Sequence, residues 1–378
     1  AGFMIDGSGV TVSTGVTTAN LYPGLMSFGN GNQFVVDWTR VRKWAGADPV
    51  TTLGTEEPYY TNQWTGLDLT DGTNWHDADN WTNGIPDNTS NILIPDVTNQ
   101  PVISSGDAAC NRIVIQTGAT VEIANTRTLY VSGYWINEGG TLITGSGTVS
   151  FSGLVQTIGG SSSTGFNNLI INSSVSTTLL INTSVSGNLS ITGGIFDLGS
   201  YTCDRVTNGG TLAMGENTIL KIAGTGTALP ANFADHSFDP TSQVDYCGEA
   251  QTVSEVSYAS LILSGSGVKT FPAAGLSASL LSISGSATAA LPDGSSSAAG
   301  TLILGGEAAL SGSYGSTSSA ADNTDDQYFT VGYTGIVTHN YVDGKWLGLT
   351  DNRWSNAANW YGGVPDASTD VLITADAS

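Results

Sequence analysis

The sequence predicts an all-β protein built mainly as a right-handed parallel β-helix, and three observations lead to that fold class. Short segments of alternating apolar and polar residues recur along the chain, each followed by a turn rich in Gly, Ser or Asn. A longer stretch of sequence also repeats within the chain. Finally, 49 Gly residues accompany 39% apolar residues, which is enough apolar material for a core in a fold of many tight turns.

Between about residues 91 and 310, apolar residues recur at i and i+2, as in strands that bury one face. The strands that we expect include RIVI (112–115), TVEI (120–123), TLYV (128–131), NLII (168–171), NLSI (188–191) and SLIL (260–263). The side chains expected to point inward include Ile113, Ile115, Val121, Ile123, Leu129, Val131, Leu169, Ile171, Leu189 and Ile191.

Strands spaced about 8 to 12 residues apart suit a β-sandwich as well as a solenoid, and the longer repeat favours the solenoid. The segment VSFSGLVQT (149–157) matches VDYCGEAQT (244–252), and FNNLII (166–171) matches YASLIL (258–263). Such self-similarity indicates stacked units that cover one another's apolar faces. With three short strands per turn, a coil takes about 22 residues, and about ten coils would make a rod roughly 50 Å long.

A Trp-rich segment occurs twice. The first copy is QWTGLDLTDGTNWHDADNWTNGIPDNTSNILIP (63–95), and the second is KWLGLTDNRWSNAANWYGGVPDASTDVLIT (345–374). We interpret each copy as the opening of a module. The chain would then hold one complete module at 61–341 and the start of the next at 342–378.

The repeats also carry a family resemblance. The segments at 215–243, 244–271 and 312–338 resemble the β-helical repeats of very large bacterial surface proteins and adhesins, whose modules open with W-x-G, N-W and G-x-P-D elements like those in residues 63–95. The segment FVVDWTRVRKWAGADPVTTLGTEE (34–57) resembles the last strand and exit of a concanavalin-A-like domain of unknown function. The resemblance implies that residues 1–60 are the final strands of a jelly-roll β-sandwich, and that the chain is a window from a longer protein.

Charge excludes some classes of partner. The chain has 10 Lys and Arg against 32 Asp and Glu, so its formal net charge of −22 would repel nucleic acids and anionic lipid surfaces. No apolar run reaches the ~20 residues that span a bilayer. We therefore expect no nucleic-acid partner and no membrane insertion, whereas the resemblance to bacterial surface proteins implies an extracellular or cell-surface location.

The Trp-rich opener has two interpretations. Exposed rings of Trp64, Trp75 and Trp81 could stack on sugars, as in a glycan-binding module. The alternative is that these residues cap the end of the solenoid and shield its apolar edge, and their recurrence wherever a module begins favours the cap.

The same segment is rich in carboxylates. Asp68, Asp71, Asp77 and Asp79 offer oxygen ligands of the kind that Ca²⁺ prefers, although no complete calcium-loop motif is present. A second candidate of this kind is DNTDD (322–326), which could equally be an acidic turn. Ca²⁺ is the only cofactor that the sequence suggests.

Nothing in the sequence indicates an enzyme. Polysaccharide-cleaving β-helices need clustered carboxylates, usually with a basic residue, and no such local cluster is present. His76, His236 and His339 stand far apart with no Ser or Cys motif beside them, so we interpret them as surface histidines.

A disulfide between Cys203 and Cys247 is the last expectation. If residues 225–243, with two Pro, leave the rod as an excursion, the two cysteines would lie about one coil apart and could stack on adjacent turns. In the family's pattern an apolar or aromatic residue and an Asn stand at these places, so the paired departure also suggests a bridge. Two separate buried thiols are the alternative.

These observations lead to the expectation of a non-enzymatic structural segment of a large extracellular protein, acting as a stalk or fibre element. Its partners would be neighbouring modules or copies of itself. The alternative is a glycan-binding adhesin module that contacts surface glycans.

Overall fold

The structure, a computed structural model, describes residues 2–5, 8–11, 60–226 and 228–339, together with 344, 346–348, 350–360, 362–367, 369, 371 and 373. The chain divides into two compact units, residues 1–57 and 58–378. In the first unit, the described residues form a hairpin in which β1 (Gly2–Ile5) pairs antiparallel with β2 (Ser8–Thr11). The segment 34–57, expected to end a concanavalin-A-like domain, lies outside the described residues.

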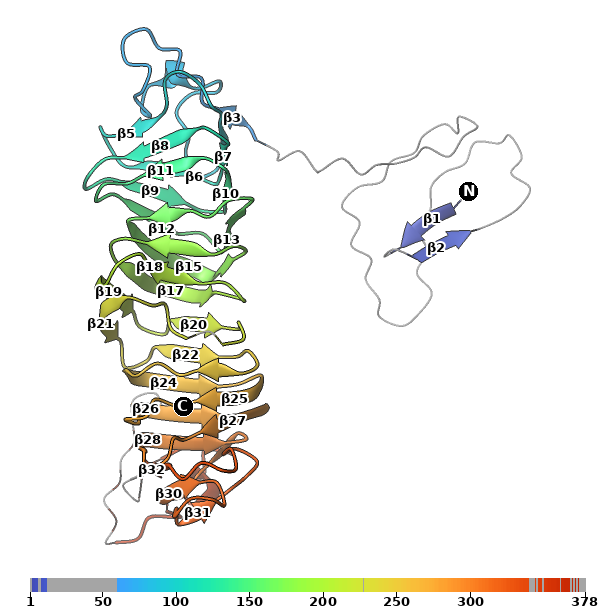
Figure 1. The fold of residues 1–378 in the computed structure, drawn as a ribbon, viewed down its shortest axis with the longest axis vertical. Helices are drawn as coiled ribbons and strands as arrows, with labels where there is room; N and C mark the ends of the chain where they lie inside the picture. Colours follow the sequence, from blue (N-terminus) through green and yellow to red (C-terminus); the bar gives the residue numbers. More distant parts are fainter. Residues whose placement is uncertain are drawn as a thin grey trace. The chain divides into compact units, whose positions relative to one another are not determined.

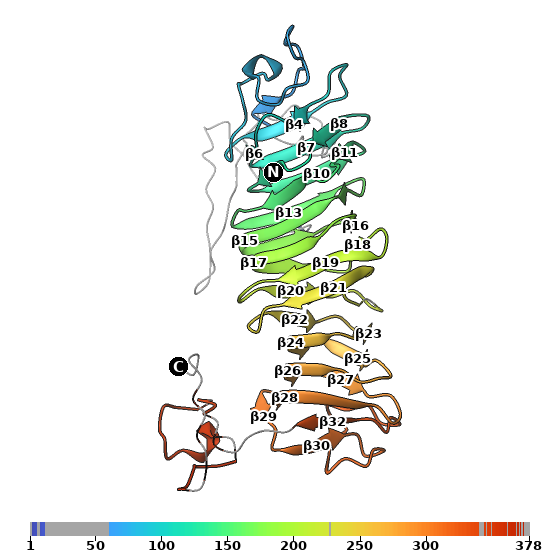
Figure 2. The same cartoon turned by 90° about the vertical axis from the view of Figure 1, so that its left-hand side faces the viewer.

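The second unit contains a parallel β-solenoid of about ten turns, which confirms the predicted all-β fold and its stacked coils. Figures 1 and 2 show the strands lying one above another along the long axis of the solenoid. Its first half contains β3 (Asn62–Gln63), β4 (Asn91–Ile94), β5 (Val102–Ile103), β6 (Ala108–Cys110), β7 (Arg112–Gln116), β8 (Thr120–Ile123), β9 (Thr128–Val131), β10 (Tyr134–Glu138), β11 (Thr141–Ile143), β12 (Thr148–Phe151), β13 (Val155–Gly160), β14 (Gly165–Phe166), β15 (Asn168–Leu179), β16 (Thr183–Val185) and β17 (Leu189–Asp197).

The second half continues the same pattern. It contains β18 (Cys203–Arg205), β19 (Gly209–Met214), β20 (Ile219–Ile222), β21 (Phe233–Phe238), β22 (Gln243–Tyr246), β23 (Gln251–Thr252), β24 (Ser257–Leu263), β25 (Ser266–Thr270), β26 (Ser277–Ile283), β27 (Ser286–Ala290), β28 (Ser296–Leu304), β29 (Glu307–Ala308), β30 (Gly312–Gly315), β31 (Asn323–Thr324) and β32 (Ile336–His339). Two short 3₁₀ helices, η1 (Ala78–Asn80) and η2 (Ala357–Asn359), lie in the two Trp-rich segments.

Registers between the strands show how the coils stack. Ile113 of β7 pairs with Trp135 of β10, and Trp135 pairs with Ile158 of β13, so a coil here takes about the 22 residues expected for three short strands and their turns. Between β22 and β24 the coil is shorter, because Val244 pairs with Leu261. Among the described residues, the pairings between strands from β3 to β28 are parallel, as the solenoid prediction requires.

Rows of apolar side chains fill the inside of the coils. Leu129, Val149, Leu169, Leu189 and Leu212 occupy matching positions on consecutive coils, and all are fully buried. All ten side chains that the alternation placed inside are fully buried as well, so this prediction is confirmed. Each is worth about 1.5–3 kcal/mol relative to an exposed position, which makes these rows the main source of stability.

Asn side chains connect the turns of successive coils. The Asn111 amide donates to Asn91 Oδ1 at 2.8 Å, and Asn188 N donates to Asn168 Oδ1 at 3.1 Å. Thr211 N then donates to Asn188 Oδ1 at 2.9 Å, so the same device continues to the next coil. Backbone N–H groups in the turn of one coil thereby find hydrogen-bond acceptors in the Asn side chains of the neighbouring coil.

The segment 225–243 is part of the stack, and the prediction of an excursion is wrong for most of it. Strand β21 pairs in parallel with β19, and Gln243 at the start of β22 pairs with Ile219 of β20. The two prolines, Pro230 and Pro240, lie in the connections on either side of β21, where no ladder hydrogen bond is lost.

The last coil is closed differently from the others. Strand β32 adds to β28 in parallel, and β30 then pairs antiparallel with β32. The short β29 folds back antiparallel on β28. These returns cover strand edges that would otherwise be free to pair with another chain.

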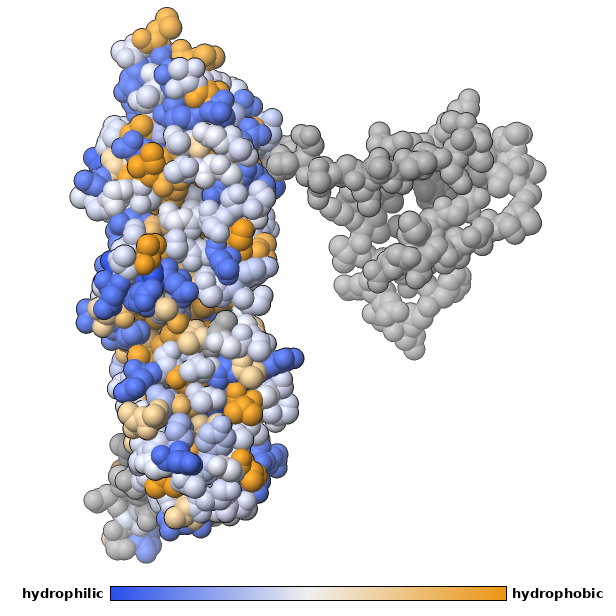
Figure 3. All heavy atoms as spheres, viewed as in Figure 1, coloured by the Kyte–Doolittle hydropathy of each residue, from blue (hydrophilic) through white to orange (hydrophobic). Residues whose placement is uncertain are grey.

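The solenoid surface on the face shown in Figure 3 is mainly pale or blue, with small, separate apolar areas. This follows from outward rows of Ser, Thr, Asn and Gly. No helix among the described residues is long and apolar enough to cross a membrane.

Candidate functional site

The first Trp-rich segment forms a compact cap on the solenoid. Trp81 lies between Trp64 and Trp75 in two edge-to-face contacts, with ring centroids 5.0 and 4.8 Å apart. Trp64 and Trp75 are fully buried, and Trp81 is 5% exposed. The alternative interpretation, that exposed faces of these three rings stack on sugars, does not agree with this burial, whereas the favoured capping interpretation does.

Hydrogen bonds fix the three indoles in place. The Trp64 indole N–H donates to Asn99 O at 2.7 Å, and the Trp81 indole N–H donates to Trp75 O at 2.8 Å. Asn80, also fully buried, holds the loop between them: its Oδ1 accepts from Asp68 N at 2.9 Å, and its amide donates to Asp71 O and Asn74 O at 2.9 and 3.0 Å. Because the Asn80 amide has hydrogen-bond partners at both its oxygen and its nitrogen, its burial costs little free energy. These hydrogen bonds also fix the conformation of the loop around it.

The cap is joined to the first coil through backbone hydrogen bonds. Strand β3 pairs in parallel with β4, and Trp64 N donates to Leu93 O at 3.0 Å. Trp75 N donates to Val102 O at 3.1 Å, so β5 covers this part of the cap. The cap thus adds a first layer to the solenoid, instead of standing apart from it.

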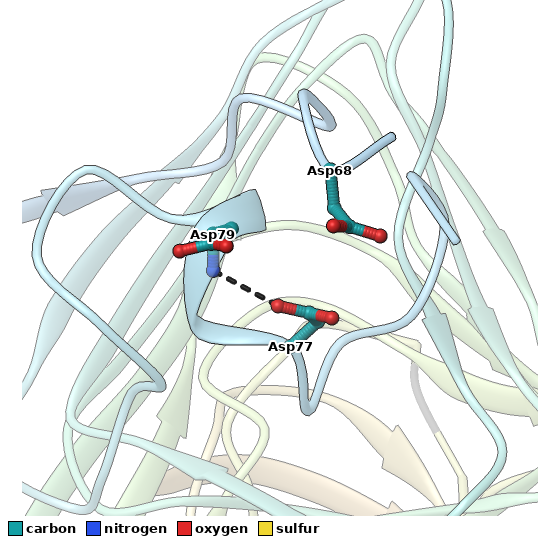
Figure 4. Close-up of side chains that lie close together, drawn as sticks. All are labelled: Asp68, Asp77 and Asp79. Carbon is teal, nitrogen blue, oxygen red and sulfur yellow. Dashed lines mark hydrogen bonds between the residues drawn. The ribbon is translucent and has the colours of Figure 1, made fainter. Parts of the chain in front are cut away.

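Three of the four predicted cation ligands lie together on the cap. One carboxylate oxygen from each of Asp68, Asp77 and Asp79 lies within 4.8 Å of the others (Figure 4). Asp77 is the N-cap of η1 and accepts from Asp79 N at 3.0 Å, while Asp68 accepts from Thr70 N at 2.8 Å. Convergent carboxylates are ligands suited to a hard cation such as Ca²⁺, although Ca²⁺ takes six to eight oxygens and these residues supply part of that set.

The other predicted acidic positions do not join such a group. Asp71 Oδ1 accepts from the N–H and hydroxyl of Thr73, and Asp71 does not belong to the group of three carboxylates, so its prediction as a ligand with them does not agree with the structure. In DNTDD (322–326), Asp322 accepts from Ser313 and Asp326 accepts from Thr317. Within the described residues, Asp68, Asp77 and Asp79 form the only group of three such ligands, and residues 322–326 contribute to none.

The second Trp-rich segment repeats the local structure of the first. Trp360 contacts Trp346 and Trp354 edge to face at 4.8 and 4.3 Å, and η2 precedes Trp360 as η1 precedes Trp81. Asn359 takes the place of Asn80 and accepts from Thr350 N at 3.0 Å. In contrast to Trp75, Trp354 is 50% exposed.

The carboxylates of the first copy are not repeated in the second. Where Asp77 caps η1, Asn356 caps η2, and Ala358 stands where Asp79 stands. The pKa of Asp351 is held below its ordinary value because Arg353 N–H and the Asn356 amide donate to its carboxylate. The tryptophans and the buried Asn are therefore the shared framework, and the acidic cluster belongs to the first copy.

The histidines differ from one another. The His236 side chain is largely exposed to solvent, and the burial of part of the ring lowers its pKa. His76 is half-buried and bonds to Asp107 O at 2.9 Å. His339 is fully buried beside Ala299 O at 3.3 Å, so its interpretation as a surface histidine is wrong; the alternation of β32 turns it inward.

The disulfide predicted between Cys203 and Cys247 is not formed, and both residues are free thiols, as is Cys110. Cys203 lies in β18 and pairs with Thr183 of β16, whereas Cys247 follows β22 on a different sheet. The predicted disulfide required residues 225–243 to lie outside the coils, so that the two cysteines would be one coil apart. Strand β21, within this segment, instead pairs with β19 as part of the stack. Burial raises the pKa of the Cys203 thiol, which makes it a poor nucleophile.

A shallow groove of about 640 Å³ lies beside the cap and was not predicted. Its lining includes Tyr130, which is 41% exposed, and the polar side chains of His76, Asp87 and Asp107. Thr89 and Ser90 donate to the exposed Asp87 carboxylate and lower its pKa. An accessible aromatic ring among acceptors can bind a polyhydroxylated ligand. Sequence alternation identifies Tyr130 as outward-facing, but not which residues lie beside it.

Comparison with known proteins gives one match. A family model described as a domain of unknown function (DUF8693) matches residues 63–175, which hold the Trp cap and the first coils. No curated protein matches the chain. No solved structure matches it either.

Proposed function

We propose that this chain is a non-catalytic structural segment of a large extracellular surface protein, acting as a stalk or fibre element. The observation that carries the proposal is the recurrence of one Trp cap: the same edge-to-face triad and buried Asn stand before the solenoid and again after it. A cap that recurs in this way is what a tandem array of solenoid modules needs at each joint. The concanavalin-A-like and adhesin contexts belong to the proposal through sequence resemblance alone.

The surface of the chain supports contact with neighbouring modules or copies of itself. Leu67 and Leu69 of the cap loop are 73% and 102% exposed, and apolar surface of this kind suits a protein partner. The net charge of −22 favours solubility of a long assembly and disfavours nucleic acid.

Electron microscopy of the purified chain over a range of concentrations tests the structural role. We expect thin rods of constant width, joined end to end as the concentration rises. Globular particles without a rod would contradict the proposal. Incubation with neutral and acidic polysaccharides should leave their length unchanged, and cleavage that is lost on replacement of a single Asp or Glu would contradict the non-catalytic role.

The groove beside Tyr130 favours glycan binding as the second candidate function. A glycan array on the intact chain separates the two functions, because a spacer should show no saturable binding. If a glycan binds, the variant Tyr130→Ala should lose binding. The matched control is Tyr134→Ala, because Tyr134 is similarly exposed at 44% but lies outside the groove lining.

A further inference from the structure

The two matching turns of the longer repeat differ in their chemistry. The turn S-G-L-V-Q ends at Gln156, and C-G-E-A-Q ends at Gln251; both glutamines are buried in matching surroundings. In the first turn, the Gln156 amide reaches back to Ser132 O at 3.5 Å, and its Oε1 accepts from the Thr177 hydroxyl at 2.9 Å. This turn shows what a structural glutamine needs, which is one acceptor from the coil before it and one donor from the coil after it.

In the second turn, an amine replaces the hydroxyl. Lys269 pairs directly with Gln251 between β25 and β23, as Thr177 pairs with Gln156. Its side chain is fully buried, and Nζ lies 2.6 Å from Gln251 Oε1. Nζ also donates to Gly248 O and Glu249 O, both at 2.7 Å, so three acceptors hold the amine in one place.

The Gln251 carboxamide is polarised and fixed from both sides. Gly248 N donates to Oε1 at 2.9 Å, in addition to the contact from Lys269. The amide nitrogen donates to Ile222 O at 2.8 Å. Nζ contacts Oε1, the atom bonded to the carbon Cδ that a nucleophile would attack, and Gly248 N–H already donates to the oxygen that would gain negative charge.

We propose that Lys269 and Gln251 join spontaneously in an isopeptide bond that staples two adjacent coils of the solenoid. The ammonium first loses a proton to solvent. The Nζ–Cδ bond then forms, negative charge passes to Oε1 and is stabilised by Gly248 N–H, and the Cδ–Nε2 bond breaks on collapse. The second proton released by Nζ leaves with Nε2 as ammonia, so one amine and one carboxamide give one secondary amide and one ammonia without an oxidant or reductant.

The electrostatics of the site favour this step. Burial lowers the pKa of Lys269 to about 8, so a substantial fraction of the amine is neutral and nucleophilic in mildly alkaline solution. A competing nucleophile nearby is the Cys247 thiol, which donates to Ile222 O at 3.6 Å and whose pKa is raised by burial. The staple does not depend on the proposed function, although it would resist the unzipping of coils in a molecule under tension.

Intact-mass spectrometry of the folded full chain tests the staple. We expect a mass lower than that of the sequence by one ammonia, and a digest that yields one branched peptide joining Gln251 to Lys269. The same chain kept in denaturant from the outset should keep its full mass. A folded chain of full sequence mass after incubation at pH 8 would overturn the proposal.

Variants identify the nucleophile. Lys269→Met should restore the full mass, whereas Cys247→Ser should still lose one ammonia. The opposite pattern, with the loss kept in Lys269→Met and absent from Cys247→Ser, would overturn the proposal in favour of a thioester. As the matched control at the repeated turn, Thr177→Val should leave the ammonia loss unchanged. If Lys269→Met fails to fold, the branched peptide of the unaltered chain decides the matter by itself.

Discussion

The two Trp caps share an internal structure but differ in what covers them. In the first, Trp75 N donates to Val102 O of the solenoid, and the ring is fully buried; in the second, Trp354 makes the same contact with its neighbouring indole yet is half exposed. The edge-to-face triad and the buried Asn are thus common to both caps, whatever the exposure of the outer indole. In the first cap the outer indole is buried with the first coil bonded beside it, and no described residue covers Trp354 in that way.

The largest expected effect separates the two outer tryptophans. Trp75→Ala should lower the free energy of unfolding by about 3–5 kcal/mol, because it leaves a cavity under a covered ring. Trp354→Ala should cost no more than about 1–2 kcal/mol, because half of that ring is already in water. Urea unfolding followed by circular dichroism measures both. Equal losses would contradict the difference between the caps.

Removal of the buried amide should have the next largest effect. Asn80→Ala removes the acceptor of Asp68 N and one of the two donors to each of Asp71 O and Asn74 O, so we expect a loss of about 1–3 kcal/mol. The control is Asn83→Ala, an exposed Asn of the same segment whose side chain makes only a 3.4 Å contact with Thr61 O. A neutral Asn80→Ala would show that the amide does not hold the loop.

Calcium should act on the first cap alone. If Asp68, Asp77 and Asp79 bind Ca²⁺ at about the 10⁻⁴–10⁻³ M affinity of extracellular modules, millimolar Ca²⁺ should stabilise the chain by about 1–2 kcal/mol. Asp77→Asn, which keeps the η1 cap acceptor, should abolish the shift in Tm, whereas Glu216→Gln, at an exposed acid in the solenoid, should not. An unchanged Tm on addition of Ca²⁺ would rule out the site.

A smaller effect concerns acid titration in the second cap. The lowered folded-state pKa of Asp351 means that its carboxylate adds stability above its ordinary pKa of 3.8, and that this stability is lost as the pH falls through the folded-state value. Carbon-detected NMR should find the midpoint below 3.8. In Asn356→Ala the midpoint should rise, because one donor to the carboxylate is gone. A midpoint at or above 3.8 in the unaltered chain would contradict this contact.

The features that depend on local pattern could be predicted from the sequence. The inward rows follow from alternation, so Ile171 and Leu189 could be placed in the core without knowledge of their neighbours. The cap could be inferred from its recurrence. His339 shows the limit of interpreting isolated residues, because only the register of β32 turns it inward.

Features that depend on pairing between coils could not be predicted. The two prolines around β21 favour an excursion in the sequence, but they lie in the connections on either side of a strand that pairs within the stack. The predicted disulfide depended on that excursion and is wrong as well. Asp71 resembles Asp77 in sequence, but its carboxylate lies outside the group that Asp68, Asp77 and Asp79 form. The contact between Gln251 and Lys269 needs the register of β23 against β25, which a single sequence does not supply.

Amide hydrogen exchange of the intact chain tests the comparison of the caps most directly. Peptides that cover residues 62–82 and 346–360 contain the same triad and the same 3₁₀ helix, so they serve as each other's control. We predict slow exchange for the first, because the solenoid accepts the N–H groups of Trp64 and Trp75, and distinctly faster exchange for the second. Equal protection of the two segments would contradict the claim that the first coil of the solenoid closes the cap.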